Sequence, residues 1–519
     1  MSLDTIDVVV FIAYVIGLIA VAMYVSREKD GHEKGANDYF LAGNSLPWWA
    51  VGASLIAANI SAEQIIGMSG SGFKIGLAIA SYEWMAAITL MIIGKYCLPI
   101  FLEKKIYTMP QFLEERFDSR VRVTMAVFWL GVYVLVNLTA ILWLGALAIN
   151  TITGVDLMAG MIFLGLFSVA YSLYGGLKAV AFTDIIQVVL LIFGGLFLSY
   201  TALDLIGQGE GIIAGFAALT EQAPEKFDMI LAKDSEHYMD LPGLSVLVGG
   251  MWIMNLSYWG FNQYIIQRTL AAKSLREGQK GIAFAAFLKL LMPVIVVLPG
   301  IAAVVLLPNL ERPDQAYPQL MNLMPVGLKG LVFAALVAAI VSSLASMTNS
   351  IATIFTMDLY KSDTKSRSEQ HYVKVGRFVS LGALVIAMVV AQPLLGQFDQ
   401  AFQYIQEFTG FFTPGIVVLF ITGMFWKKTT ANAGLFAAIG SFVLSLVLKY
   451  SWPTLPFMDR VGIVFLSCLA IAVVVSLIEN KTQEKAIDLD NVSFKTTGGF
   501  NIATVAVIAI LIAFYSAWW

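Results

Sequence analysis

Several polar side chains interrupt long apolar stretches of this chain. The stretch WWAVGASLIAANISAEQIIGMSGSG carries Asn59, Ser61, Glu63 and Gln64 in its middle, followed by three glycines. An unpaired polar or charged group is costly in hydrocarbon, so such groups usually face a cavity or a polar partner. Amides and carboxylates together both donate and accept hydrogen bonds. The chemistry that they indicate is recognition of a small polar molecule.

A second stretch repeats this pattern. GGMWIMNLSYWGFNQYIIQR places Asn255, Ser257, Tyr258, Asn262 and Gln263 in an otherwise apolar, glycine-containing run. Both stretches predict helices that are broken in the middle of a membrane, where freed carbonyls and helix ends face a cavity. For the first stretch the alternative is an intact helix whose small residues pack against a neighbouring helix.

Ionisable residues also lie in other apolar segments: Glu83, Asp184, Lys289 and Glu407. One interpretation is that Glu83 and Lys289 form a buried ion pair that only holds helices together. The other is that both reach a central cavity, where a carboxylate and an ammonium match the mixed donors and acceptors of a polyol. Amides that would join them are Asn59, Gln64, Asn255 and Gln406. This set favours a neutral ligand that is rich in hydroxyl groups.

A pair of serines indicates an ion position. The segment AALVAAIVSSLASMTNS contains adjacent Ser342 and Ser343, with Ser346 one turn later. Hard cations prefer oxygen ligands, which hydroxyls and the carbonyls of a broken helix supply. The alternative is structural, because serines in membrane helices often bond back to their own helix.

The elements that must position these residues are membrane-spanning helices. Of the 519 residues 59% are hydrophobic and 13% are charged, and the mean hydropathy of +0.79 excludes a soluble surface. Apolar runs of about 20 residues, enough to cross a hydrocarbon core about 30 Å thick, recur along the chain. We predict an all-α polytopic membrane protein rather than a β-barrel, whose segments would be short and alternating. About fourteen spans are expected, near residues 7–26, 46–70, 76–102, 123–152, 158–175, 179–206, 241–265, 281–307, 327–356, 376–396, 403–425, 432–450, 460–478 and 499–518.

The two interrupted stretches lie in spans two and seven. Five helices per repeat force opposite membrane orientations, so this spacing predicts a five-plus-five inverted repeat, which is typical of alternating-access transporters. A pore would instead repeat around an axis along the membrane normal. We expect a single transporter domain over 1–519. Its parts are an extra N-terminal helix and loop (1–45), repeat 1 (46–239), repeat 2 (240–426) and three C-terminal helices (427–519).

Basic residues predict the orientation. Lysine and arginine near span ends stay in the cytoplasm, and the odd-numbered loops hold roughly 23 of them against about 5 elsewhere. Both termini are therefore expected outside. The first span follows no basic segment and precedes Arg27, so it is interpreted as a retained helix rather than a signal peptide.

The sequence gives little support for an enzyme or for a nucleic-acid-binding protein. Cys97 and Cys468 lie in apolar runs without metal-ligand spacing, and the histidines are scattered over loops. Neither a nucleophile–base pair nor a basic, aromatic-interleaved patch is visible. We expect no enzyme activity and no nucleic-acid partner. An alternative from another class of protein is a membrane sensor or enzyme built on a transporter scaffold. The loops are too short to hold an added signalling domain, which argues against this alternative.

Longer strings connect these residues to a known family. They are ANISAEQIIGMSGSG, ASYEWM, YGGLKAVAFTDIIQ, YWGFNQYIIQRTLAAKS, FAALVAAIVSSLASM and AFQYIQEFTG. Along nearly the whole chain the sequence closely resembles the sodium/solute symporter family, and within it the bacterial sodium/galactose cotransporters. The resemblance implies a leucine-transporter-type core of ten helices in two inverted repeats, with one helix before it and three after it. It also implies sodium-coupled symport of a neutral hexose, galactose or glucose, across a bacterial inner membrane.

The resemblance further assigns roles to individual residues. The sodium site falls on the carbonyls of Ala57, Ile60 and Ala339 and the hydroxyls of Ser342 and Ser343. The sugar-binding positions are Asn59, Gln64, Glu83, Asn255, Lys289 and Gln406, with Tyr258 stacking on the sugar and gating the inward exit. The outward gate falls on Met68, Tyr82 and Phe402. Asp184 matches a carboxylate on the sodium exit path to the cytoplasm.

Two positions depart from the galactose carriers. Ala86 replaces a serine three residues after the binding glutamate, which removes a hydroxyl near the pocket. Ser257 replaces a tyrosine just before the gating tyrosine, which removes aromatic bulk. Neither position is among the expected sodium ligands. The resemblance therefore supports sodium coupling more strongly than it supports a particular sugar.

A sodium-coupled carrier of another solute, such as myo-inositol, an amino acid or a carboxylate, is the main alternative. An acidic substrate would need an unpaired cation or a helix N-terminus for its carboxylate. Lys289 balanced by Glu83 argues against it. The expected partners are the sugar, Na+ and the lipid bilayer, with a homodimer that transport does not require.

Overall fold

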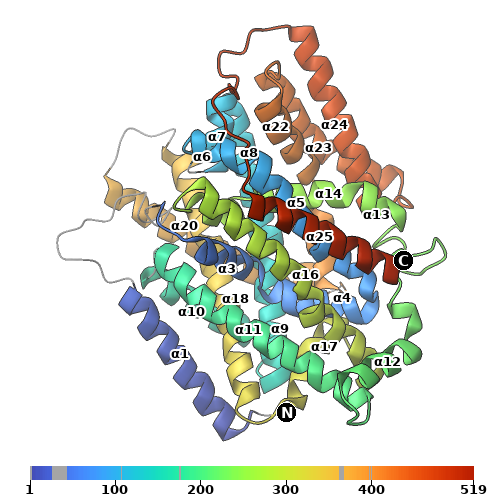
Figure 1. Ribbon diagram of the computed structural model, residues 1–519. Coiled ribbons are helices and arrows are strands. Elements are labelled where there is room, and N and C mark those ends of the chain that lie inside the picture. The colour runs from blue at the N-terminus through green and yellow to red at the C-terminus, as the bar shows by residue number, and fades with distance from the viewer. Residues whose placement is uncertain are drawn as a thin grey trace.

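The computed structural model describes residues 3–25, 44–106, 108–174, 177–361, 368–396, 398 and 400–519. Within these ranges the chain is helical and contains no β-strand, and nine of its helices are long and apolar enough to cross a membrane. Figure 1 shows the helices as one bundle, with α1 (Thr5–Val25) at one edge and α24 (Phe457–Glu479) at the opposite edge. The all-α membrane fold is confirmed, whereas the count of fourteen spans stays a prediction. Arg27 lies outside the described residues.

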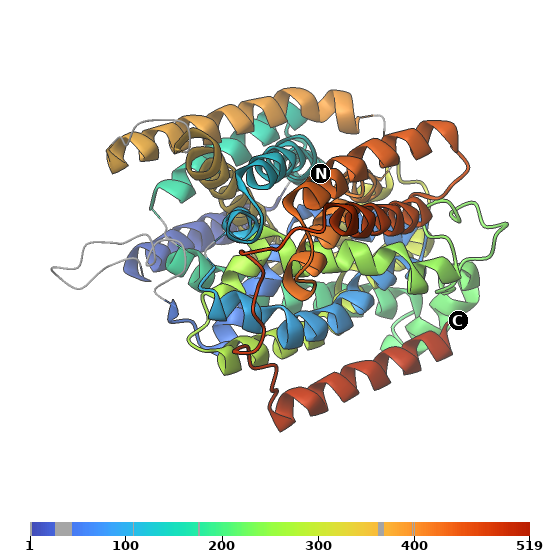
Figure 2. The same cartoon turned by 90° about the horizontal axis from the view of Figure 1, so that it is seen from above.

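The other long helices lie where spans were expected. They are α5 (Ser81–Tyr96), α8 (Ser119–Val132) with η4 (Tyr133–Leu138) and α9 (Thr139–Thr153), α10 (Leu157–Tyr174), α11 (Leu177–Ile206), α16 (Leu275–Leu306), α18 (Leu328–Thr353), α20 (Glu369–Leu395), α23 (Ala431–Ser451) and α25 (Gly498–Ala517). Figure 2 shows α20 and α25 at opposite rims of the bundle. Only 11% of the most apolar stretch of α25 is buried. An apolar helix with so little protein cover suits contact with lipid.

The second span is broken, as its polar residues predicted. Helix α3 (Trp48–Asn59) ends at Ile60, whose backbone is extended (φ −72°, ψ 91°). The chain resumes as the π-helix η2 (Glu63–Gly67) and α4 (Met68–Lys74), and the two halves are bent by 62°. The end of α3 frees carbonyl groups of its last turn. The intact helix is therefore excluded.

The seventh span is interrupted as well. A short helix α13 (Leu244–Val248) ends at a glycine, and α14 (Gly250–Leu256) continues into the π-helix η6 (Ser257–Phe261). Asn262 then has an extended backbone (φ −86°, ψ 122°) before α15 (Gln263–Leu270) begins. The first helices of both expected repeats are thus broken.

A third broken span departs from expectation. Residues 403–425 were predicted to form one continuous helix, but α21 (Ala401–Thr409) and α22 (Thr413–Phe425) meet at a bend of 47°. Pro414 lies in the first turn of α22. Proline lacks a backbone N–H and cannot donate the hydrogen bond that would continue α21, but it is tolerated in the first turn of a new helix.

Helix α16 approaches α3 and α4 closely. A Cβ atom on Gly300 would lie 2.1 Å from the carbonyl oxygen of Ser69, and one on Gly281 would lie 2.8 Å from that of Trp48. Only glycine permits such an approach between helices. Because Lys289 lies between these two glycines in sequence, α16 brings it beside the break in the second span.

Candidate functional site

Four side chains form a hydrogen-bonded network at the break of the second span. Gln64 Nε2 donates to Glu83 Oε1 (2.6 Å) and to Asn59 Oδ1 (3.2 Å). Lys289 Nζ lies 2.5 Å from Glu83 Oε2 and also donates to Asn59 Oδ1. Glu83 and Lys289 are both buried. Residues from α3, η2, α5 and α16 are thereby joined around one carboxylate and one ammonium.

Lys289 occupies the rear of this network. It is fully buried and does not line the cavity. Its ammonium lies 4.8 Å from the centroid of the Trp259 ring, a cation–π distance. In this conformation Lys289 therefore acts on the cavity through Glu83 and Asn59 rather than by facing it.

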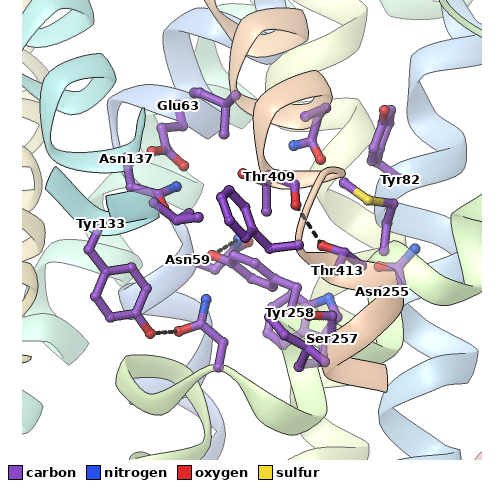
Figure 3. A pocket seen from close by; sticks show the side chains of 18 of the residues that line it. Asn59, Glu63, Tyr82, Tyr133, Asn137, Asn255, Ser257, Tyr258, Thr409 and Thr413 are labelled. Carbon is purple, nitrogen blue, oxygen red and sulfur yellow. Dashed lines mark hydrogen bonds between the residues drawn. The ribbon is translucent and has the colours of Figure 1, made fainter. Parts of the chain in front are cut away.

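Figure 3 shows the cavity that the network borders. Expected substrate-binding residues that line it are Asn59, Gln64, Glu83, Asn255, Tyr258 and Gln406. Its wall also contains the aromatic rings of Trp259 and Phe412. Small-molecule sites commonly combine an apolar or aromatic surface with a few placed polar groups. This lining suits a ligand with apolar ring faces and polar edges.

Tyr258 lines one side of the cavity. Its hydroxyl accepts a hydrogen bond from Asn59 Nδ2 (3.0 Å) and lies 2.9 Å from the hydroxyl of Tyr264. Beside it, Tyr133 Oη donates to Asn262 Oδ1 (2.6 Å). These contacts join both broken spans and η4 on the side where the inward gate is expected.

Tyr82 and Phe402 meet elsewhere on the cavity wall. Their ring centroids are 5.1 Å apart and their planes are nearly perpendicular, a favourable aromatic arrangement. Met68 is fully buried and does not line the cavity. Two of the three expected outward-gate residues are therefore brought together, and Met68 lies behind the wall.

The expected sodium ligands come from α3, from Ile60 directly after it, and from α18, and the two helices contact each other. Since α3 ends at Asn59, the carbonyl of Ala57 belongs to a last turn without intrahelical donors. On α18 the buried Ser343 Oγ has no hydrogen-bond partner among the described residues. A buried unpaired hydroxyl is destabilising unless a ligand satisfies it. Carbonyl and hydroxyl oxygens of this kind fit a hard cation such as Na+.

Asp184 lies next to these ligands. Its Oδ1 accepts a hydrogen bond from Ser342 Oγ (2.7 Å), and its Oδ2 lies 3.8 Å from Arg268 Nη2. Arg268 also donates to the carbonyl of Tyr264 (2.5 Å) and to Ser346 Oγ (3.3 Å). The carboxylate is thus held beside the serine pair by contacts from α15 and α18.

Several polar residues line the cavity without having been assigned to it from the sequence: Glu63, Tyr133, Asn137 and Thr409. The sequence does mark two of these residues as unusual, because Glu63 lies at membrane depth and Asn137 interrupts the apolar run YVLVNLTAIL. A single polar residue does not reveal which face of its helix meets the cavity. For Asn137 the π-helical turn of η4 sets that face.

Other residues that were singled out have different surroundings. Ala86 is buried and does not line the cavity, whereas Ser257 does. Glu407 is not part of the wall either, because it pairs with Lys449 (2.8 Å) and Arg460 (3.2 Å). It ties α21 to the C-terminal helices α23 and α24.

Comparison with known sequences supports this architecture. The model of the sodium:solute symporter family matches residues 39–440. A relative named sodium/glucose cotransporter, from Vibrio parahaemolyticus, is 52% identical over 100% of this chain and 99% of its own length. The sodium/myo-inositol cotransporter 2 of Homo sapiens is 34% identical over 85% of this chain and 69% of its own length.

Among solved structures, a Na+-coupled sialic acid symporter in a substrate-bound, outward-open state has a TM-score of 0.78. It is 24% identical, and the match covers 92% of this chain and 98% of that one. This likeness shows a shared fold. The family model and the full-length relatives together show that the chain belongs to the sodium:solute symporter family.

Proposed function

We propose that the protein imports a neutral hexose, galactose or glucose, by coupling its movement to inward sodium flow. The observation that carries this proposal is the network of Asn59, Gln64, Glu83 and Lys289. It offers amide donors and acceptors around a carboxylate that one ammonium balances, which matches a neutral polyol. The relative named sodium/glucose cotransporter supports the same substrate class.

The sugar would lie against Glu83 and Gln64, with Asn255 and Gln406 as further hydrogen-bonding groups. Each of these side chains lines the cavity. Tyr258 would stack on the ring and separate it from the inward exit. Lys289 would orient the Glu83 carboxylate at the cavity wall through their ion pair.

Sodium would couple to the sugar through the break in the second span. We assign it to the carbonyls of Ala57, Ile60 and Ala339 and the hydroxyls of Ser342 and Ser343, and we place Asp184 on its route to the cytoplasm. Binding there would tie α3 to α18 and fix Asn59, the last residue of α3. A ligand shifts a conformational equilibrium only by its differential affinity for the two states. Sodium and sugar must therefore favour the same occluded form, which makes their binding mutually cooperative.

Alternating access would follow from two gates. Tyr258 would close the inward side through its hydrogen bonds, and Met68, Tyr82 and Phe402 would close the outward side. A membrane potential of about 100 mV contributes about 2.3 kcal/mol per charge, and a tenfold sodium gradient about 1.4 kcal/mol. One sodium per sugar would then sustain a sugar gradient on the order of several hundredfold.

The remaining assignments concern topology. We propose inverted repeats over 46–239 and 240–426, with 1–45 and 427–519 outside them, in a bacterial inner membrane with both termini outside. The excess of basic residues in the odd-numbered loops supports this orientation. A homodimer is compatible with the proposal, since the cavity is built from one chain.

Myo-inositol is a second candidate substrate. The relatives named sodium/myo-inositol cotransporter 2 favour it, and the network would accept any compact neutral polyol. Competition by myo-inositol against labelled galactose and glucose separates the two candidates.

Sodium-dependent binding tests the proposal. The purified protein should bind radiolabelled galactose or glucose at least about tenfold more tightly in sodium than in choline, as expected for ordinary coupling energies between sites. Equal affinity in the two salts would contradict the coupling. Binding of myo-inositol without hexose binding would show that myo-inositol, the second candidate, is the substrate.

A further inference from the structure

The cavity contains a second carboxylate, which the proposed sugar and sodium positions do not use. Glu63 is the first residue of η2, directly after the break, and only 9% of it is exposed. Figure 3 shows its side chain pointing toward Asn137, and both residues line the cavity. Oxygen Oε1 of Glu63 has no hydrogen-bond partner among the described residues. A buried polar atom that borders a cavity without a partner marks a ligand position.

Nearby cations are already engaged. Lys289 lies 2.5 Å from Glu83, and Arg268 lies 3.8 Å from Asp184. In the part of the chain that the structure describes, Glu63 has no ion pair with a basic side chain. The titratable groups that line this cavity beside Glu63, or lie next to its wall, are Glu83, Tyr82, Tyr133, Tyr258 and Tyr264. Three further elements that pack against η2, which are η7 (Pro313–Gln315), α17 (Ala316–Leu320) and α21, add Asp314, Tyr317, Tyr404 and Glu407. None of them supplies positive charge to Glu63.

The missing partner must be charged. An ionised carboxylate taken out of water is destabilised more than one neutral hydrogen bond compensates. A sugar hydroxyl would supply such a hydrogen bond and no charge. We propose that Glu63, with Asn137, is a second cation position of the cavity, which takes up a sodium ion or a proton when the cavity closes. This inference rests on the proposed cation coupling but not on the identity of the sugar.

The position is separate from the assigned sodium site. That site joins α3 to α18, whereas Glu63 and Asn137 join η2 to η4 on the cavity wall. For a sodium ion the ligands would be a Glu63 oxygen and the Asn137 amide oxygen, which a rotation of the amide presents. For a proton, Glu63 would become neutral beside Asn137.

Equilibrium binding of radioactive sodium to the purified full-length protein, without sugar, tests this inference. Measurements at about pH 6 and about pH 8 bracket the range in which a perturbed carboxyl group titrates. Glu63→Gln is the test variant, and Glu115→Gln, an exposed glutamate of α7 (Met109–Arg116), is the matched control. If the ligand is sodium, Glu63→Gln binds one fewer sodium ion per chain than the wild type and the control. If it is a proton, the stoichiometry is unchanged, but the roughly tenfold pH dependence of wild-type sodium affinity disappears in Glu63→Gln alone.

Identical sodium stoichiometry and identical pH dependence in all three proteins would overturn the inference. So would a Glu63→Gln variant that changes only hexose affinity, because the carboxylate would then be a sugar ligand. Should Glu63→Gln not fold, the wild type decides: one sodium ion per chain and a pH-independent affinity refute a second cation. A wild type that binds sodium as described here but transports no hexose refutes only the proposed substrate.

Discussion

Replacing Lys289 by methionine should both destabilise the protein and abolish hexose binding. The substitution leaves Glu83, which is only 2% exposed, without the ammonium now 2.5 Å away. Removing one partner of a buried ion pair costs about 3–5 kcal/mol. At about 1.4 kcal/mol per factor of ten, this is a change of about one hundredfold to several thousandfold in the folding equilibrium. Hexose binding should fall below detection, because Lys289 no longer holds the Glu83 carboxylate and the Asn59 amide in place at the cavity.

The double variant Glu83→Gln/Lys289→Met distinguishes the effect of the ion pair on stability from its effect on hexose binding. It removes both charges and nearly preserves volume, so most of the stability should return. Hexose binding should not return, because Glu83 lines the cavity and the amide presents one acceptor where the carboxylate had two. Thermal unfolding and binding of radiolabelled galactose and glucose report the two quantities. Lys95→Met, which changes a partly exposed lysine on α5, the helix that carries Glu83, serves as the control.

The outcome that refutes this reasoning is restored hexose binding in the double variant. The pair would then only hold α5 and α16 together, and substrate recognition would have to come from other residues of the cavity.

Further substitutions test the ion site, the inward gate and a buried cap. Ser343→Ala should lose sodium-dependent binding at unchanged thermal stability, since Ser343 Oγ has no partner among the described residues; unchanged sodium affinity would remove it from the site. Tyr258→Phe removes hydrogen bonds to Asn59 and Tyr264, at about 1 kcal/mol each, and should favour the inward-open state by about tenfold or more. Labelling of a cysteine introduced beside the gate measures this shift, and equal labelling of variant and parent would contradict it. Arg116→Met should lower the unfolding free energy by about 2–4 kcal/mol, because the buried guanidinium donates to one carbonyl in the last turn of α22 and to two carbonyls that follow this helix; an unchanged melting temperature would show that water replaces it.

Polar residues made the broken helices predictable. Asn59 and Glu63 in one span, and Asn255 and Asn262 in another, are incompatible with lipid, and both spans break at or near them. The structure also shows that the two interpretations of Glu83 coexist. It forms a buried pair with Lys289 and at the same time lines the cavity.

Other features depend on how helices rotate and pack, which residue types alone do not determine. Met68 and Lys289 lie behind the cavity wall, whereas Glu63 and Asn137 face it. The bend before Pro414 follows from a proline signal that an otherwise apolar segment obscured. The sequence therefore predicted which segments form helices, but it did not predict which face of each helix is turned toward the cavity.

Uptake into proteoliposomes tests the central claim most directly. Radiolabelled galactose and glucose, with proline as control, are offered to vesicles containing the protein, with and without an inward sodium gradient. The account predicts accumulation of at least one hexose only when the gradient is present, and no accumulation of proline. Failure of both hexoses to accumulate under either condition would contradict sodium-coupled hexose transport.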